Sequence, residues 1–259
     1  MPLVEHLREL RKRLLLSALA LLVGVVVCYV LWEPIFHFLR EPYCKANPKK
    51  SCELIVTGVF DAFNTKLRVS FIGGIVATSP IWLYQIGAFI TPALHKHERR
   101  YAGGFLAGAL ALFLAGCTLG FLSVGHGLKI LLHIAGPEVH SFLTLDKYFS
   151  FLMLMLLLFG IAFEFPVIVI FLNLTGLLTF ERMVRWQRGM IFCLFLAAAV
   201  LTPSTDPFTF LFLGLALVIL WELCVAAAWI RSRRRKAKRP PDDLDLDTPS
   251  YVDTTPSQI

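Results

Sequence analysis

The sequence predicts an all-α integral membrane protein that crosses the bilayer about six times. Hydrophobic residues make up 57% of the chain and charged residues only 17%, whereas a soluble domain carries about 25% charged residues. The apolar residues come in long blocks, which is typical of bilayer-spanning helices rather than of one large soluble core. We expect no cleavable signal peptide, because the first apolar block is too long for one and more blocks follow.

The first segment, residues 1–13, is patterned as a helix. Leu3, Leu7, Leu10 and Leu14 recur at helical spacing and form one apolar stripe, while charged side chains cover much of the remaining surface. We therefore expect a cytoplasmic amphipathic segment that lies on the membrane and continues into the first span.

Six apolar blocks follow within residues 14–230, which we treat as one transmembrane domain. Two of the blocks contain a proline that should kink the helix, Pro80 in the second and Pro166 in the fourth. The fifth is short, because about 13 residues extend only about 20 Å, against a hydrocarbon core of about 30 Å. The expected spans are 14–31, 63–92, 102–124, 148–174, 189–201 and 208–230.

The longer connections and the tail are expected to lie outside the bilayer. Residues 33–62 and 125–147 are interpreted as polar loops, and residues 231–259 as a basic and then acidic disordered tail. Cys44 and Cys52 flank a polar part of the first loop. In an oxidising compartment they could form a disulfide, and otherwise they are two free thiols.

The distribution of positive charge predicts the orientation of the chain. Most of the 25 lysine and arginine residues lie in the N-terminal segment, the connections 93–101 and 176–188, and the first part of the tail. Short segments rich in Lys and Arg stay in the cytoplasm. We therefore expect both termini to be cytoplasmic and the Cys44/Cys52 loop to lie outside, which supports the disulfide.

The sequence shows no constellation of residues that is typical of an enzyme. It contains no G-x-S-x-G motif, no P-loop for ATP and no H-E-x-x-H zinc motif, and His95 and His97 fit a solvated turn better than a metal site. We therefore expect no enzymatic activity, no cofactor, no metal and no nucleic-acid partner.

Two carboxylates at the predicted cytoplasmic surface, Glu9 and Glu98, are surrounded by basic residues. One interpretation is local salt bridging to Arg13 or Arg100, which contributes little at a surface. The other is a pair of acceptors for a cationic ligand, since a carboxylate binds a guanidinium through two parallel hydrogen bonds that lysine cannot reproduce.

Glu164 lies within the apolar fourth span, where an ionised carboxylate costs about 2.5–3.5 kcal/mol on insertion scales. It is therefore either neutral or directed into a polar cavity. Pro166 exposes the carbonyl of Ala162, so one interpretation is a docking or gating site and the other is a glutamic acid bonded to its own helix. The main alternative function is a proton-coupled secondary transporter that uses Glu164, although the first half holds no counterpart of this motif.

Four stretches of the chain carry linked motifs. They are H-L-R-E-L-R-K-R-L at 6–14, A-F-I-T-P-A-L-H-K-H-E-R-R at 88–100, F-G-I-A-F-E-F-P-V at 159–167 and L-T-P-S-T-D-P-F at 201–208. Together they resemble the TatC family, the multi-spanning receptor subunit of the twin-arginine translocase.

The resemblance implies a concave, glove-shaped bundle in the cytoplasmic membrane. Such a receptor binds twin-arginine signal peptides and helps to export folded proteins by using the proton-motive force. Its implied partners are the single-span subunits TatA and TatB, the membrane lipid and further copies of the receptor.

The resemblance also implies a group of signal-peptide-binding residues. In the family, the glutamates that match Glu9 and Glu98 bind the paired arginines. Arg11, Phe89 and Pro42 match positions that are important for function, and we place them in the same group.

A second implied group, for partner docking, consists of Glu164, Thr202 and Asp206. The family's usual P-P-D-x-x-[ST]-Q pattern is replaced here by P-S-T-D-P-F-T-F, with Phe210 where glutamine is common. This departure affects the polar docking site directly after the fifth span.

Overall fold

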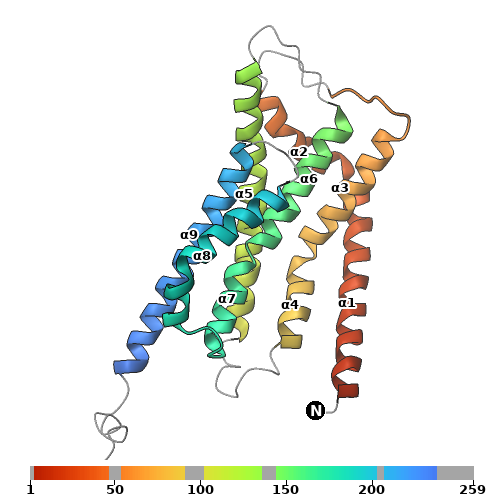
Figure 1. Ribbon diagram of the computed structural model, residues 1–259. Coiled ribbons are helices and arrows are strands. Elements are labelled where there is room, and N and C mark those ends of the chain that lie inside the picture. Colours follow the sequence, from red (N-terminus) through yellow and green to blue (C-terminus); the bar gives the residue numbers. More distant parts are fainter. Residues whose placement is uncertain (1–2, 47–53, 91–101, 136–143, 203–206, 238–259) are drawn as a thin grey trace, which may run out of the picture.

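The computed structural model describes residues 3–46, 54–90, 102–135, 144–202 and 207–237, which are mostly helical (Figure 1). Five segments of this described part are helices long and apolar enough to cross a membrane, and the bent pair α3–α4 makes six if it counts as one span. This confirms the predicted all-α, multi-span fold. The helices are α1 (Leu3–Val30), α2 (Trp32–Ala46), α3 (Asp61–Ala77), α4 (Ser79–Ile90), α5 (Ala102–Ala135), α6 (Leu145–Ala162), α7 (Phe165–Leu174), α8 (Phe180–Leu201) and α9 (Pro207–Ala237).

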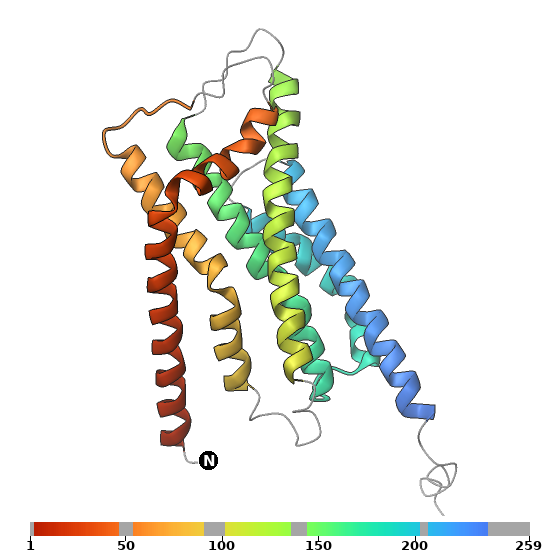
Figure 2. The same ribbon diagram turned by 180° about the vertical axis from the view of Figure 1, so that it is seen from behind.

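The two ends of the molecule differ in which elements they hold. The beginning of α1, the end of α4 and the end of α9 lie at one end, which we call the N-terminal end (Figure 1; Figure 2). Helix α2 lies at the opposite end. The start of the first span and the end of the last therefore share one side, as an even number of crossings requires, and the assignment of that side to the cytoplasm stays a prediction.

Helix α6 lies at the centre of the packing. It contacts α5 and α3, and its side chains Tyr148, Phe149, Leu152 and Phe159 are 2% exposed or less. The hydroxyl of Tyr148 donates a hydrogen bond of 2.9 Å to the backbone oxygen of Leu39, which ties α2 to α6.

Glycines permit two pairs of helices to approach closely. A Cβ atom added at Gly116 of α5 would lie 2.5 Å from the backbone oxygen of Phe159 in α6. A Cβ atom added at Gly74 of α3 would lie 2.8 Å from the backbone nitrogen of Val25 in α1. Any larger residue at these positions would push the helix backbones apart.

Two expected loops are partly helical, which corrects the prediction. Helix α2 begins the segment 33–62 that was predicted as a loop, with Pro34 in its first turn, where a missing N–H is tolerated. Leu39 and Tyr43 of α2 are buried, so this helix is held by its apolar face. Helix α5 likewise continues to Ala135, into the second expected loop.

The N-terminal segment is continuous with the first span. Helix α1 runs without interruption from Leu3 to Val30, and Leu7, Leu10 and Leu14 are exposed along one side. That exposed stripe agrees with an apolar face for the membrane, while the surface position of the segment stays a prediction.

The kink expected at Pro80 is confirmed, whereas near Pro166 the structure shows a break in the helix within one continuous candidate span, Leu145–Leu174. Helices α3 and α4 meet at an angle of 53° immediately before Pro80. Two residues separate the end of α6 from the start of α7 at Phe165, next to Pro166. The expected length of the fifth span, about 13 residues, is wrong, because α8 begins at Phe180, nine residues before the expected start. Its 22 residues extend about 33 Å, although it is still the shortest of the candidate spans and its first turns carry charged side chains.

We expect Gly116→Ala to lower the thermal stability of the purified chain in detergent. The added methyl group would meet the backbone oxygen of Phe159, and such overpacking costs about 1–3 kcal/mol. The matched control is Gly108→Ala on the same helix, where nothing lies within 4 Å of an added Cβ. The control should melt at or above the wild-type temperature, since alanine is the better helix former. Equal melting temperatures for the two variants would contradict a tight α5–α6 crossing.

Candidate functional site

Glu9 lies on the side of α1 that faces α4, and it is already paired. Arg13, one turn further along α1, donates to Oε1 of Glu9 from Nε at 3.0 Å and from Nη2 at 2.6 Å. The side chains of Glu9 and Arg13 are only 29% and 23% exposed. The local salt bridge, one of the two interpretations of Glu9, is therefore present. Its partial burial makes it stronger than an ion pair in open water.

The same helix pair is joined by two further contacts. Nη1 of Arg13 lies 3.4 Å from Oε1 of Gln85 on α4. The rings of His6 and Phe89 stack with their centroids 4.4 Å apart. The structure therefore brings Phe89 near the Glu9 region at the N-terminal end of the molecule, as the predicted grouping requires.

Two members of the predicted signal-peptide group lie elsewhere. Arg11 lies with Arg8 and Lys12 on another side of α1, beside exposed leucines. Pro42 is buried in α2, at the opposite end of the molecule from the first turns of α1. Glu98 lies outside the described residues, so its pairing with Glu9 stays a prediction.

Sequence reasoning missed Gln85, which binds the guanidinium that occupies Glu9. A lone glutamine inside an apolar stretch was the available signal. It also missed a hydrogen bond of 2.9 Å from Nε2 of Gln187 on α8 to Oε1 of Glu222 on α9. These polar pairs fix neighbouring helices relative to each other where apolar contacts alone leave them free to slide.

Glu164 lies at the break between α6 and α7. Its Oε1 atom is buried and has no hydrogen-bond partner among the described residues. The alternative in which Glu164 is bonded to its own helix is therefore not supported for this oxygen. A buried acceptor without a partner costs about 1–3 kcal/mol, so a donor from another chain would be stabilising here.

Thr202 caps the C-terminal end of α8. It is buried, and its hydroxyl donates a hydrogen bond of 2.6 Å to the backbone oxygen of Ala198. Asp206, the third member of the docking group, lies outside the described residues. The structure thus places Glu164 and Thr202 on two different spans and leaves the grouping a prediction.

The cysteines divide into two kinds. Cys28, Cys117, Cys193 and Cys224 are free, whereas Cys44 is disulfide-bonded. Cys52 lies outside the described residues, so its identity as the partner stays a prediction.

Metal ligands were not expected from the sequence. No group of three or more His, Cys, Asp or Glu side chains suited to a metal ion occurs in the described part of the chain. His95 and His97 lie outside that part.

Comparisons with known proteins agree on one family. Residues 5–215 match the family described as Sec-independent protein translocase protein (TatC). The TatC protein of Frankia casuarinae is 41% identical over 98% of this chain and 73% of its own length, and that of Aquifex aeolicus is 32% identical over 91% and 98%. The fold is similar to a crystal structure of the twin arginine translocase receptor TatC in DDM, with a TM-score of 0.76 and 31% identity over 86% of this chain and 99% of that one.

We expect Cys44 to resist alkylation when the protein is denatured without reductant. The Cys52→Ser variant should make Cys44 reactive, whereas Cys193→Ser, which removes an exposed free thiol, should leave it protected. Mass spectrometry of the alkylated peptides measures both results. Modified Cys44 in the wild-type chain would rule out the bridge, and a protected Cys44 in the Cys52→Ser variant would rule out Cys52 as its partner.

Proposed function

The chain belongs to the TatC family of Sec-independent protein translocase proteins, and we propose that it is a receptor for twin-arginine signal peptides. The observation that carries this proposal is the partly buried pair of Glu9 and Arg13 beside α4. Glu9 already holds a guanidinium group there, so the site has the shape and charge that an arginine side chain needs. An arginine of the peptide would occupy the same carboxylate.

A twin-arginine motif needs a second carboxylate, and we propose that Glu98 supplies it. Glu98 belongs to the connection that leaves α4 at Ile90, directly after the Phe89 ring that stacks on His6. Phe89 would then contact the apolar part of the peptide. Because Pro42 lies at the opposite end of the molecule, its importance for function would be indirect.

We further propose that the receptor works with partners in the cytoplasmic membrane, with both termini in the cytoplasm. The single-span subunits TatA and TatB would dock at Glu164, Thr202 and Asp206, and receptor copies would associate with each other. Among the residues that the structure describes, none bonds Oε1 of Glu164, and this supports the docking site, since a partner's donor would satisfy that oxygen. Export would draw on the proton-motive force, and the chain would act as a receptor rather than as an enzyme.

Family membership favours the translocase over the proton-coupled secondary transporter. In the transporter alternative, Glu164 would carry a proton or bind a small solute. Solute uptake that depends on Glu164 is the observation that would favour it.

We expect Glu9→Gln and Glu98→Gln each to reduce photo-crosslinking of a twin-arginine signal peptide in membranes by roughly 10- to 100-fold. A hydrogen bond to a charged group contributes about 1.5–3 kcal/mol, and the neutral amide forfeits most of it. The matched control is Glu5→Gln, an exposed acid one turn before Glu9, which should leave capture unchanged. Equal capture of twin-lysine and twin-arginine peptides would contradict the proposal.

Arg13→Gln should raise the affinity for the same peptide severalfold. In the wild-type chain the peptide has to displace the Arg13 guanidinium from Glu9, and the variant removes this competitor. Arg8→Gln, which removes one positive charge from a more exposed position of α1, should not produce the gain. A titration of labelled peptide measures both dissociation constants. A loss of affinity in Arg13→Gln would show that Arg13 orients Glu9 instead of competing for it.

A further inference from the structure

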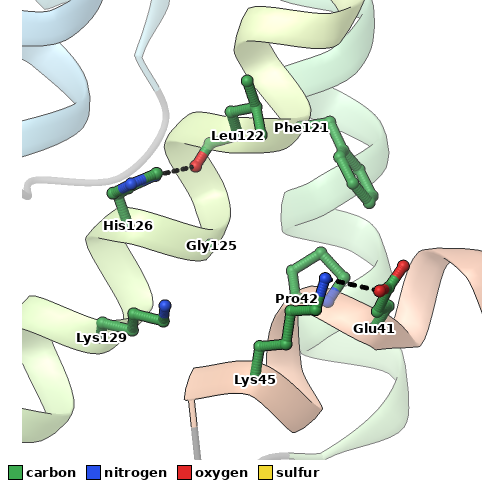
Figure 3. A pocket seen from close by; sticks show the side chains of 8 residues that line it. All are labelled: Glu41, Pro42, Lys45, Phe121, Leu122, Gly125, His126 and Lys129. Atoms are coloured by element: carbon green, nitrogen blue, oxygen red, sulfur yellow. Dashed lines mark hydrogen bonds and ion pairs between the residues drawn. The ribbon is translucent and has the colours of Figure 1, made fainter.

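A small pocket opens between α2 and α5 at the end of the molecule opposite the proposed receptor site (Figure 3). Its cavity volume is about 120 Å³. The residues that matter for its chemistry are Glu41, Pro42 and Lys45 from α2 and Leu122, His126 and Lys129 from α5. Of the residues in the predicted receptor group, Pro42 also lines this pocket, and the receptor proposal gives it no direct contact with the peptide.

The charges around the pocket do not balance. Glu41 and Lys45 form an ion pair of 2.6 Å and cancel each other's charge. Lys129 is exposed and makes no ion pair with any described residue. It is therefore the uncompensated cation among the residues that line the cavity, and the pocket favours an anion.

His126 adds a polar group to the same wall. Its Nδ1 lies 2.9 Å from the backbone oxygen of Leu122 (Figure 3). A carbonyl oxygen only accepts, so Nδ1 carries the hydrogen and Nε2 remains available for a ligand. A hydroxyl group of a ligand can donate to Nε2 while an anionic oxygen of the same ligand accepts from Lys129.

The pocket lies near the boundary of the hydrocarbon core. His126 follows the first residue of α5, Ala102, by 24 positions, or about 36 Å of helix, against a core of about 30 Å. Leu122 is 46% exposed, and Phe38, which stacks on Phe121 with ring centroids 5.0 Å apart, is 59% exposed. Exposed apolar surface thus adjoins the basic group. This arrangement complements a phospholipid, whose anionic headgroup adjoins its apolar acyl chains.

We propose that this pocket binds the phosphate headgroup of an anionic phospholipid. Lys129 is the charge partner of the phosphate, and the exposed side chains of Leu122 and Phe38 contact the upper part of an acyl chain. A free phosphate ion shares the headgroup chemistry but leaves that apolar surface in water. The apolar surface is therefore the observation that favours a lipid over an ion.

Native mass spectrometry of the full chain, released from detergent micelles that contain dioleoylphosphatidylglycerol, tests the proposal. The wild-type chain should retain this lipid in preference to dioleoylphosphatidylcholine. Lys129→Gln should reduce retention about fivefold, the effect expected of one lysine at a membrane surface, and Lys129→Arg should restore it. The matched control is Lys147→Gln, an exposed lysine in the first turn of α6, which should change nothing.

Three results would overturn the proposal. Equal retention by the wild-type chain and Lys129→Gln would show that Lys129 does not bind the headgroup. Equal losses in Lys129→Gln and Lys147→Gln would show that the attraction is general and not a property of the pocket. Displacement of the lipid by an equal concentration of inorganic phosphate would show that the ligand is a free anion. The melting temperature of each variant, measured alongside, ensures that the folded chain is compared.

Discussion

The close approach of α5 and α6 is the constraint on which the rest of the molecule depends. Lipid tails are as apolar as leucine, so helices in a bilayer associate through close van der Waals contact rather than through a hydrophobic driving force. Gly116 and Gly120 of α5 bring its surface against backbone oxygens of α6, and Gly160 of α6 receives the ring of Phe113. With α6 held in this way, α3 packs on it as well. Helix α1 is then positioned by its close crossing with α3 at Gly74.

The two helix breaks differ in how their polar groups are satisfied. At the α3–α4 break, Pro80 leaves the carbonyl of Val76 without its helical donor, and the hydroxyl of Ser79 donates to that oxygen at 2.8 Å. Trp82 donates to Ile75 at 2.9 Å in the same way. The backbone oxygens freed at this break therefore accept hydrogen bonds from side chains of the same chain, as a helix break within a membrane requires. At the α6–α7 break, Oε1 of Glu164 is buried and has no hydrogen-bond partner in the described part of the chain, so this break keeps an unsatisfied polar atom.

Features that involve residues close together in the sequence could be predicted, whereas features that depend on contacts between distant segments could not. The kink at Pro80, the helix break beside Pro166 and the pairing of Glu9 with Arg13 involve residues within one or two turns, and they were predictable. Helix α2 was missed because its prolines indicate a loop, and its apolar face is stabilised only by burial against other helices, which the sequence does not show. The separation of Pro42 from the receptor group was not predictable, because shared functional importance does not specify which end of a span a residue occupies.

The pairing of Glu9 with an internal arginine changes what the proposed receptor site can achieve. The pair is partly buried, so breaking it without replacement would leave two charges in a partly desolvated position, and Arg13 would leave Glu9 most readily as another guanidinium arrives. Gln85, 3.4 Å from Nη1 of Arg13, offers an acceptor near the displaced group. Exchanging one arginine for another would conserve the hydrogen bonds, so the net affinity gained would be smaller than the full strength of the new contact. A lysine would restore only part of them, so at the proposed site the exchange would disfavour the wrong peptide while leaving binding of the right one weak enough for later release.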